Sequence, residues 1–247
     1  MSRSVLRRSG FLRADRRGRS VASLLARGLA IGLLACAPMA GAQPVHAQEP
    51  PPIRADFLGL SASDDAHKMT DWILASGDNR GLPFLIVDKI AAKVFAFGAT
   101  GDLRGAAPAL LGLGIGDESA PDIGQRRLAS ITAAERTTAA GRFEAALGND
   151  LEQDVLWVDY DSALSLHRVI VGNPRDRRHA RLASPTPSDN RISYGCINVP
   201  VSFFDNVIVP VFAQTVGIVY ILPETKPIET IFALGEHVDA PSAANAY

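Results

Sequence analysis

The chain has 247 residues, a formal net charge of −1, 47% hydrophobic and 21% charged residues, and two cysteines. This composition excludes a collagen-like repeat, a disulfide-rich scaffold and a wholly disordered chain. The length fits one domain of generous size with a small appendage, and the body of the chain contains no apolar run of the ~20 residues that a membrane helix needs.

The first 47 residues differ from the rest in charge. They contain eight arginines and one acid, Asp15, which leaves 17 basic and 25 acidic residues in the body. An acidic body does not favour nucleic-acid binding. The basic stretch is followed by the apolar run 28–37 and by small residues at 40–42 and 45–47, which is the pattern of a secretory signal peptide with two candidate cleavage sites.

We therefore expect residues 1–47 to be a signal peptide, the protein to be exported to the periplasm or cell envelope, and no transmembrane span to remain after signal removal. A twin-arginine signal at Arg16-Arg17 and a lipoprotein site at 33–36 are weaker interpretations of the same segment.

Residues 48–79 are predicted to form a linker and a short helix. The segment 43–56 is Pro-rich and polar, which is typical of an extended linker. Ser63 is a suitable N-cap for an amphipathic helix over 63–75. Strands are expected at 84–88 and 93–98 around a turn at 89–91, with turn residues at 101–105 and an apolar segment at 109–113.

The segment 114–140 is predicted to be a long, ordered and functional loop. Further strands are expected at 155–160, 163–171 and 215–222, an Arg- and Pro-rich loop at 172–191, and a helix over 199–213 that Pro210 kinks or ends. Residues 224–247 form a tail, helical in part at most and disordered over its last eight residues. Many short strands with few helices predict a mostly β (α+β) domain over 80–223.

Cleavage of the signal peptide would remove Cys36 and leave Cys196 as the one cysteine of the exported chain. An unpaired cysteine in an exported protein is a buried inert residue, an intermolecular bridge or a reactive thiol. Gly195 allows a sharp bend before it. A helix starting just after Cys196 would lower the thiol pKa, and the amides of Gly195 and Cys196 could bind an oxyanion. The candidate bases are His167, in a predicted strand, and His179, in the Arg-rich loop.

The run Ser193-Tyr194-Gly195-Cys196-Ile197-Asn198, with Leu166-His167 upstream, resembles the catalytic signature of the L,D-transpeptidases, the YkuD-type family. That signature has a strand His, a variable loop, and Ser/Thr-His-Gly-Cys followed by an apolar residue and Arg or Asn. Segments 87–97, 108–112 and 137–143 are also similar to the family, so the resemblance covers about residues 82–222.

Two features depart from the family pattern. Tyr194 stands where the family usually has His, and 29 residues separate His167 from Cys196. His179, 17 residues before Cys196, fits the family spacing better, but a strand holds a base more rigidly than a loop, so His167 is preferred.

The resemblance implies a YkuD-like β-sandwich catalytic domain that acts on peptidoglycan stem peptides without a metal or cofactor. Cys196 would attack the carbonyl between the third and fourth stem residues, and an amine of a second stem would resolve the thioester into an L,D cross-link. His167 would activate the thiol, Ser193 would orient His167, and Gly195 would contribute to the oxyanion site.

Three further residues are candidates for substrate binding. Arg191 could pair with a stem-peptide carboxylate, Tyr194 lies beside the nucleophile, and Asn198 could bond the substrate or the backbone of the motif.

Two alternatives remain: an L,D-carboxypeptidase or other hydrolase on the same scaffold, and a catalytically inactive wall-binding module, which the Tyr194 substitution favours. Trp72 and Trp157 are expected in the core, and His67 and His237 on the surface.

Overall fold

The computed structural model describes residues 55–150 and 153–234. The predicted signal peptide with its cleavage sites, residues 43–54 of the predicted linker, and the end of the tail with His237 lie outside the described residues. Within the described ranges, no helix combines the length and the apolar character needed to cross a membrane.

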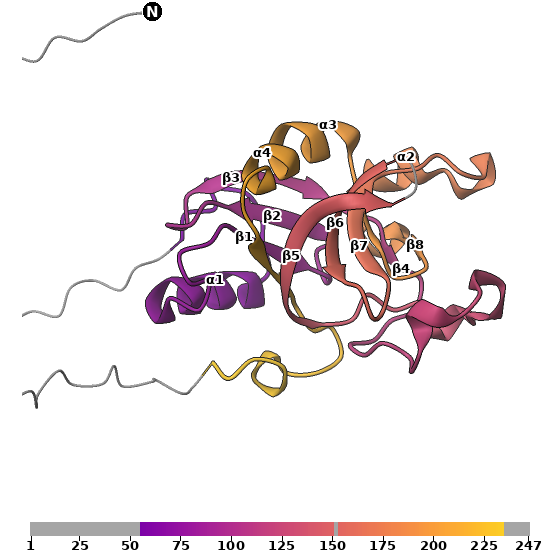
Figure 1. The fold of residues 1–247 in the computed structure, drawn as a ribbon, viewed down its shortest axis with the longest axis horizontal. Helices are drawn as coiled ribbons and strands as arrows, with labels where there is room; N and C mark the ends of the chain where they lie inside the picture. The colour runs from indigo at the N-terminus through magenta and orange to yellow at the C-terminus, as the bar shows by residue number, and fades with distance from the viewer. Residues whose placement is uncertain (1–54, 151–152, 235–247) are drawn as a thin grey trace, which may run out of the picture. The chain divides into compact units, whose positions relative to one another are not determined.

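The core of the molecule is one large mixed sheet of eight strands (Figure 1). In chain order these strands are β1 (Phe84–Asp88), β2 (Lys93–Phe97), β3 (Leu103–Pro108), β5 (Gly141–Asp150), β6 (Gln153–Asp159), β7 (Leu164–Arg168), β9 (Ile197–Val199) and β10 (Gly217–Ile221). Their order across the sheet is β3-β2-β1-β10-β5-β6-β7-β9. A separate parallel pair joins β4 (Leu111–Gly112) to β8 (Arg191–Ser193). The chain is therefore a mixed α and β protein built on a large sheet, in agreement with the α+β expectation.

Strand β5 connects the two halves of this sheet. Its first half, 141–145, pairs with β10, and its second half, 146–150, pairs with β6. The strand is strongly curved in Figure 1, so that the two halves face different directions while the ladder of strands stays continuous.

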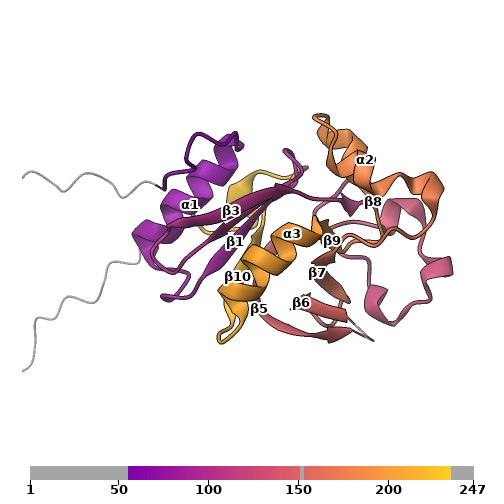
Figure 2. The same cartoon turned by 90° about the horizontal axis from the view of Figure 1, so that it is seen from above.

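Helical segments cover the two faces of β1 (Figure 2). Helix α1 (Asp64–Ser76) has Ser63 as its N-cap and the left-handed Gly77 as its C-cap, and it buries Met69 and Ile73 against a cluster that includes Phe84. The alternate residues Leu85 and Val87 face the second cluster, which includes Phe204 and Ile208 from the helical segment after β9. Because side chains alternate along a strand, β1 contributes to two separate apolar layers.

The prediction of one helix over 199–213 was wrong in part. The segment begins as β9 and continues as α3 (Val201–Phe203), a π-helical turn (Phe204–Ile208) and α4 (Val209–Phe212). Pro210 has no N–H to donate to Asn206, four residues earlier. The wider turn just before the proline accommodates this missing hydrogen bond, so the helical path continues past Pro210 instead of ending there.

Strands β3 and β5 were also not predicted. Gly105 was interpreted as a turn residue, but it lies within β3, where a Cβ atom would approach Val207 to 3.0 Å and Phe203 to 3.4 Å. The glycine therefore lets the α3 segment pack closely on the strand. Strand β5 has exposed residues at its end, with Gly, Glu, Asn and Asp that are poor strand formers.

Both long loops contain short helical pieces. The segment 114–140 has three 3-10 turns at 123–125, 128–130 and 133–135, and the segment 172–190 contains α2 (Arg178–Leu182) between two further 3-10 turns. Figure 1 shows these loops at the same end of the sheet as β4 and β8. The described part of the tail has one 3-10 turn, Ile228–Thr230.

Candidate active site

Strand β7 holds two potential catalytic side chains on the face that points away from the core. Leu164 and Leu166 are buried in the apolar cluster, so the alternate residues Ser165 and His167 lie on the other face. Strand β9 runs parallel to β7 and pairs Asn198 with His167. Cys196, directly before β9, is thereby placed beside Ser165, whose hydroxyl donates to Sγ at 3.6 Å.

The tautomer of His167 follows from its backbone contact. Nδ1 lies 2.7 Å from the carbonyl oxygen of Arg168. A carbonyl can only accept a hydrogen bond, so Nδ1 carries the hydrogen. Nε2 is then the nitrogen that can receive a proton from the thiol.

Cys196 and His167 shift each other's pKa in opposite directions. Burial raises the pKa of the Cys196 thiol, but the neighbouring His167 imidazole, together with Ser165, brings this pKa below its ordinary value. Burial lowers the pKa of His167, and its interaction with Cys196 raises the pKa above the ordinary value. Both directions favour a thiolate–imidazolium pair, the state in which a cysteine is nucleophilic.

The expected helix at the nucleophile is absent from this position. Three strand residues and Pro200 separate Cys196 from Val201, the first residue of α3. The thiol pKa is therefore lowered by His167 and Ser165 rather than by a helix dipole. This arrangement corrects the electrostatic argument drawn from the sequence.

The turn before Cys196 depends on glycine. Gly195 has φ +134°, and a Cβ atom there would lie 2.9 Å from the carbonyl oxygen of Thr137. The Gly195 carbonyl accepts a hydrogen bond from the Thr138 hydroxyl at 2.7 Å, and Thr138 Oγ1 in turn accepts from the Gly112 amide at 2.9 Å. Thr138 therefore positions the nucleophile turn, a role not foreseen from the sequence.

Ser193 holds the same turn and does not contact His167. Its hydroxyl donates to the carbonyl oxygen of Cys196 at 2.6 Å and accepts from the Gly195 amide at 3.1 Å. The expectation that Ser193 orients His167 is thus wrong. Because the Gly195 amide is occupied, the Cys196 amide, which has no hydrogen-bond acceptor within 55–150 and 153–234, is the better oxyanion donor.

Asn198 connects the nucleophile turn to the histidine. Its amide donates to the Cys196 carbonyl at 3.2 Å and lies 3.5 Å from Nε2 of His167. Its oxygen accepts from Arg178 at 3.0 Å, which fixes the orientation of the amide. The expected contact with the motif backbone is therefore present, and this buried side chain holds the nucleophile turn beside His167.

Arg191 is not available to a substrate, which corrects the proposed carboxylate contact. Its guanidinium pairs with Glu224 and donates to the Lys89 carbonyl at 3.0 Å, and its side chain is only 10% exposed. The position after Asn190, where β8 begins, turns this side chain toward the interior cluster rather than toward Cys196.

A buried ion cluster is connected to the nucleophile turn through Thr138. The ammonium of Lys89, with 0% side-chain exposure, donates to Asp117 at 2.8 Å and to the carbonyls of Gly116 at 2.7 Å and Thr138 at 2.9 Å. Burial raises the pKa of Asp117, but Lys89, Thr225 and backbone amides outweigh it and hold this pKa well below its usual range. The cluster ties the β1–β2 turn to the loop that carries Thr138.

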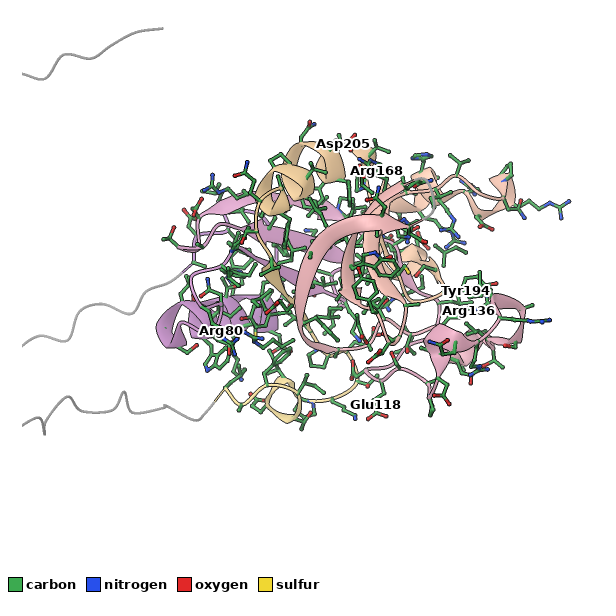
Figure 3. The ribbon with its side chains drawn as sticks, viewed as in Figure 1. Arg80, Glu118, Arg136, Arg168, Tyr194 and Asp205 are labelled. Carbon is green, nitrogen blue, oxygen red and sulfur yellow. The ribbon has the colours of Figure 1, made fainter. Side chains whose placement is uncertain are left out.

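Tyr194 and Arg136 lie against each other beside the nucleophile. The Arg136 guanidinium carbon is 3.9 Å from the centre of the Tyr194 ring, and Tyr194 is 38% exposed. Figure 3 labels both residues where the 114–140 loop meets the nucleophile turn. The cation–π contact joins the loop to the residue that departs from the family signature.

Two hollows meet at Cys196. The first is a groove of about 760 Å³ lined by Asp150, Gln153, Val155, Trp157, Ala163, Ser165, His167, Ile170 and Cys196. The second is small, about 20 Å³, and is lined by Ser119, Ile123, Glu135, Thr137, Ala139, Ser162, Ala163, Leu164, Tyr194, Gly195 and Cys196. The groove is therefore the side from which a peptide can reach the thiol, because the second hollow has room for about one water molecule.

Two other residues expected from the sequence lie elsewhere. Trp157 was expected in the core, but it is half-buried and lines the groove. His179 is exposed on α2 and lines a separate hollow with Leu182 and Pro200. The structure therefore places His167, and not His179, beside Cys196. Trp72 packs against the α1 cluster, and His67 is exposed.

In the described ranges, no group of three or more His, Cys, Asp or Glu side chains is arranged to hold a metal ion. When the chain was compared with known proteins, no family model and no curated protein matched it.

Proposed function

We propose that this chain is an exported cysteine L,D-transpeptidase with a YkuD-type, sandwich-like catalytic domain that acts on peptidoglycan stem peptides. The single observation that carries the proposal is the Cys196 thiol, whose pKa is lowered by His167 and Ser165 at the junction of two hollows. The sequence signature around Cys196 suggests the substrate class, and the geometry supports Cys196 as the nucleophile, His167 as the base and the Cys196 amide as the oxyanion donor.

The first step forms a thioester. The sulfur of Cys196 attacks the carbonyl carbon between the third and fourth stem residues, and the Cys196 amide donates to the developing oxyanion. The proton held by His167 passes to the amine of the departing fourth residue as the C–N bond breaks. The third residue is then joined to Sγ through the new C–S bond.

The second step transfers the acyl group. An amine from a second stem attacks the thioester carbon, His167 accepts the proton of that amine, and the thiolate leaves. After the fourth residue has left, the second stem enters by the groove, because the other hollow has room for about one water molecule. If water replaces the amine, the same acyl-enzyme gives a carboxypeptidase.

The immediate surroundings of the thiol argue against an inert wall-binding module. An inert buried cysteine packs among apolar groups. Cys196 is half-buried and has a hydroxyl, an imidazole and the carbonyl oxygen of Ala163 around its sulfur.

The test is incubation of the wild type and Cys196→Ala with a disaccharide tetrapeptide, followed by mass spectrometry of the products and of the intact protein. We expect a cross-linked dimer, a free D-amino acid and an acyl adduct on the wild-type protein, and none of these with Cys196→Ala. A tripeptide without dimer would assign the hydrolase. Absence of both products and of the adduct would reject the enzymatic proposal and leave the binding module.

A further inference from the structure

The groove beside Cys196 is lined by Trp157, which stacks on the exposed ring of Tyr160. The rings of Trp157 and Tyr160 are stacked, with centroids 4.5 Å apart and planes inclined by 23°. Trp157 lines the groove, and Tyr160 is 70% exposed. The stack holds the two rings together, so that Trp157 faces the groove and the exposed Tyr160 extends the aromatic surface beyond it.

The position of the indole is fixed by the neighbouring strand. A Cβ atom at Gly148 on β5 would lie 2.9 Å from Cδ1 and 3.3 Å from Nε1 of Trp157. The absence of a side chain at Gly148 thus lets the indole lie close against the sheet. On the other side, Trp157 pairs with Ser165, whose hydroxyl contacts the sulfur of Cys196.

The charge of the groove selects the kind of ligand. Its lining within the described ranges includes neither lysine nor arginine, and its polar side chains include Asp150 and Gln153. Apart from His167, whose charge is paired with Cys196, the described lining offers no positive charge to a carboxylate or phosphate. An aromatic wall with carboxylate and amide groups suits a neutral sugar, whose C–H face packs on a ring while its hydroxyls and N-acetyl groups form hydrogen bonds.

We propose that the Trp157–Tyr160 stack binds the N-acetylated sugar rings of the glycan to which the stem peptide is attached. The identity of this ligand rests on the proposed function. Three extended stem residues span ~10 Å, and Trp157 lies on the strand next to Ser165. The sugar can therefore reach the stack while the third stem residue is bonded to Sγ of Cys196. The stack thus makes the protein prefer stem peptides that still carry their disaccharide.

The binding test uses Cys196→Ala protein and tetra-N-acetylchitotetraose, a neutral sugar probe without peptide. The chain has two tryptophans, so adding Trp72→Phe leaves Trp157 as the fluorescent reporter. We expect saturable binding that changes Trp157 emission. Calorimetric titration should show that Tyr160→Ala binds the tetrasaccharide about tenfold more weakly, because one aromatic face is lost. Leu128→Ala, an exposed control outside the groove, should bind it with unchanged affinity.

A second measurement separates this inference from the proposed function. With Cys196 intact, kcat/KM is compared for a disaccharide tetrapeptide and for the sugar-free tetrapeptide; Tyr160→Ala should reduce the first and leave the second unchanged. Sugar binding with no enzymatic product would retain the stack and reject the transpeptidase. Activity without any preference for the disaccharide, or no binding of the tetrasaccharide, would overturn the sugar site. Tyr160 is the ring to replace, because it is exposed and its removal leaves the packing of Trp157 against Gly148 in place.

Discussion

Replacement of Lys89 tests whether the buried ion cluster stabilises the part of the chain that carries the nucleophile. Lys89→Met keeps most of the side-chain volume and removes an ammonium that makes three hydrogen bonds at 0% exposure. The Asp117 carboxylate would remain buried without its cation. Removing one partner of a buried pair costs about 3–5 kcal/mol of unfolding free energy.

The structure favours the lower end of this range. Asp117 still accepts hydrogen bonds from the amides of residues 224, 225 and 226 and from the Thr225 hydroxyl. These donors compensate part of the lost charge, so we expect a loss of about 3 kcal/mol. For a domain of this size, each kcal/mol lowers Tm by about 2–4 °C, which gives a decrease of about 6–12 °C.

Differential scanning calorimetry of the wild type, Lys89→Met and Lys68→Met provides the assay. Lys68 pairs with Glu229 on the surface, with side chains 49% and 53% exposed, and its replacement should change stability by less than about 0.5 kcal/mol. If Lys89→Met lowers Tm no more than Lys68→Met does, the reasoning about the buried cluster is wrong.

Alkylation of Cys196 by iodoacetamide, followed by mass spectrometry, should reach half its maximal rate at a pH below the ordinary thiol value of 9.0. Ser165→Ala should move this midpoint upward, because the thiolate loses a hydrogen-bond donor; an unchanged midpoint would contradict the role of Ser165. Gly195→Ala should slow alkylation at least ~tenfold and destabilise the fold by about 1–3 kcal/mol, because φ +134° and the close Thr137 carbonyl strain any side chain. If the variant melts by circular dichroism and is alkylated as the wild type is, the argument about Gly195 is wrong. Asp117 has a lowered pKa in the folded state, so its contribution is complete above its ordinary value of 3.8 and is lost on acidification. Urea denaturation should therefore show stability falling below that pH in the wild type and a flatter pH dependence in Asp117→Asn.

The central strands were predictable because their sequences carry a strong local signal. β1, β2 and β10 are short runs of aliphatic and aromatic residues that are buried on both faces, and such runs predict interior strands. Strands β3 and β5 lack this signal. Gly105 is needed for close helix packing, and β5 has exposed polar residues at 144, 149 and 150, so tertiary contacts rather than composition determine these two strands.

The site was predictable only where the signal is local. Cys196 and His167 were singled out by motif and strand context, and Ser165 could have been found from the alternation that puts it on the same face as His167. Thr138 and Lys89 act through partners far away in sequence: Thr138 bonds Gly195, 57 residues later, and Lys89 bonds Asp117, 28 residues later. Local patterns do not contain these pairings.

Strand β7 supplies both hydrophobic packing and the proposed proton acceptor, and this limits which insertions and deletions the chain can accept. Deleting a single codon ahead of Leu166 would exchange the two faces of β7, sending the imidazole into hydrocarbon and leucines into water. The surface segment 172–190, by contrast, can gain residues at little entropic expense. Insertions and deletions should therefore accumulate between His167 and Cys196, while the length of β7 stays constant. This explains how His167 and Cys196 lie side by side although 29 residues separate them in the sequence.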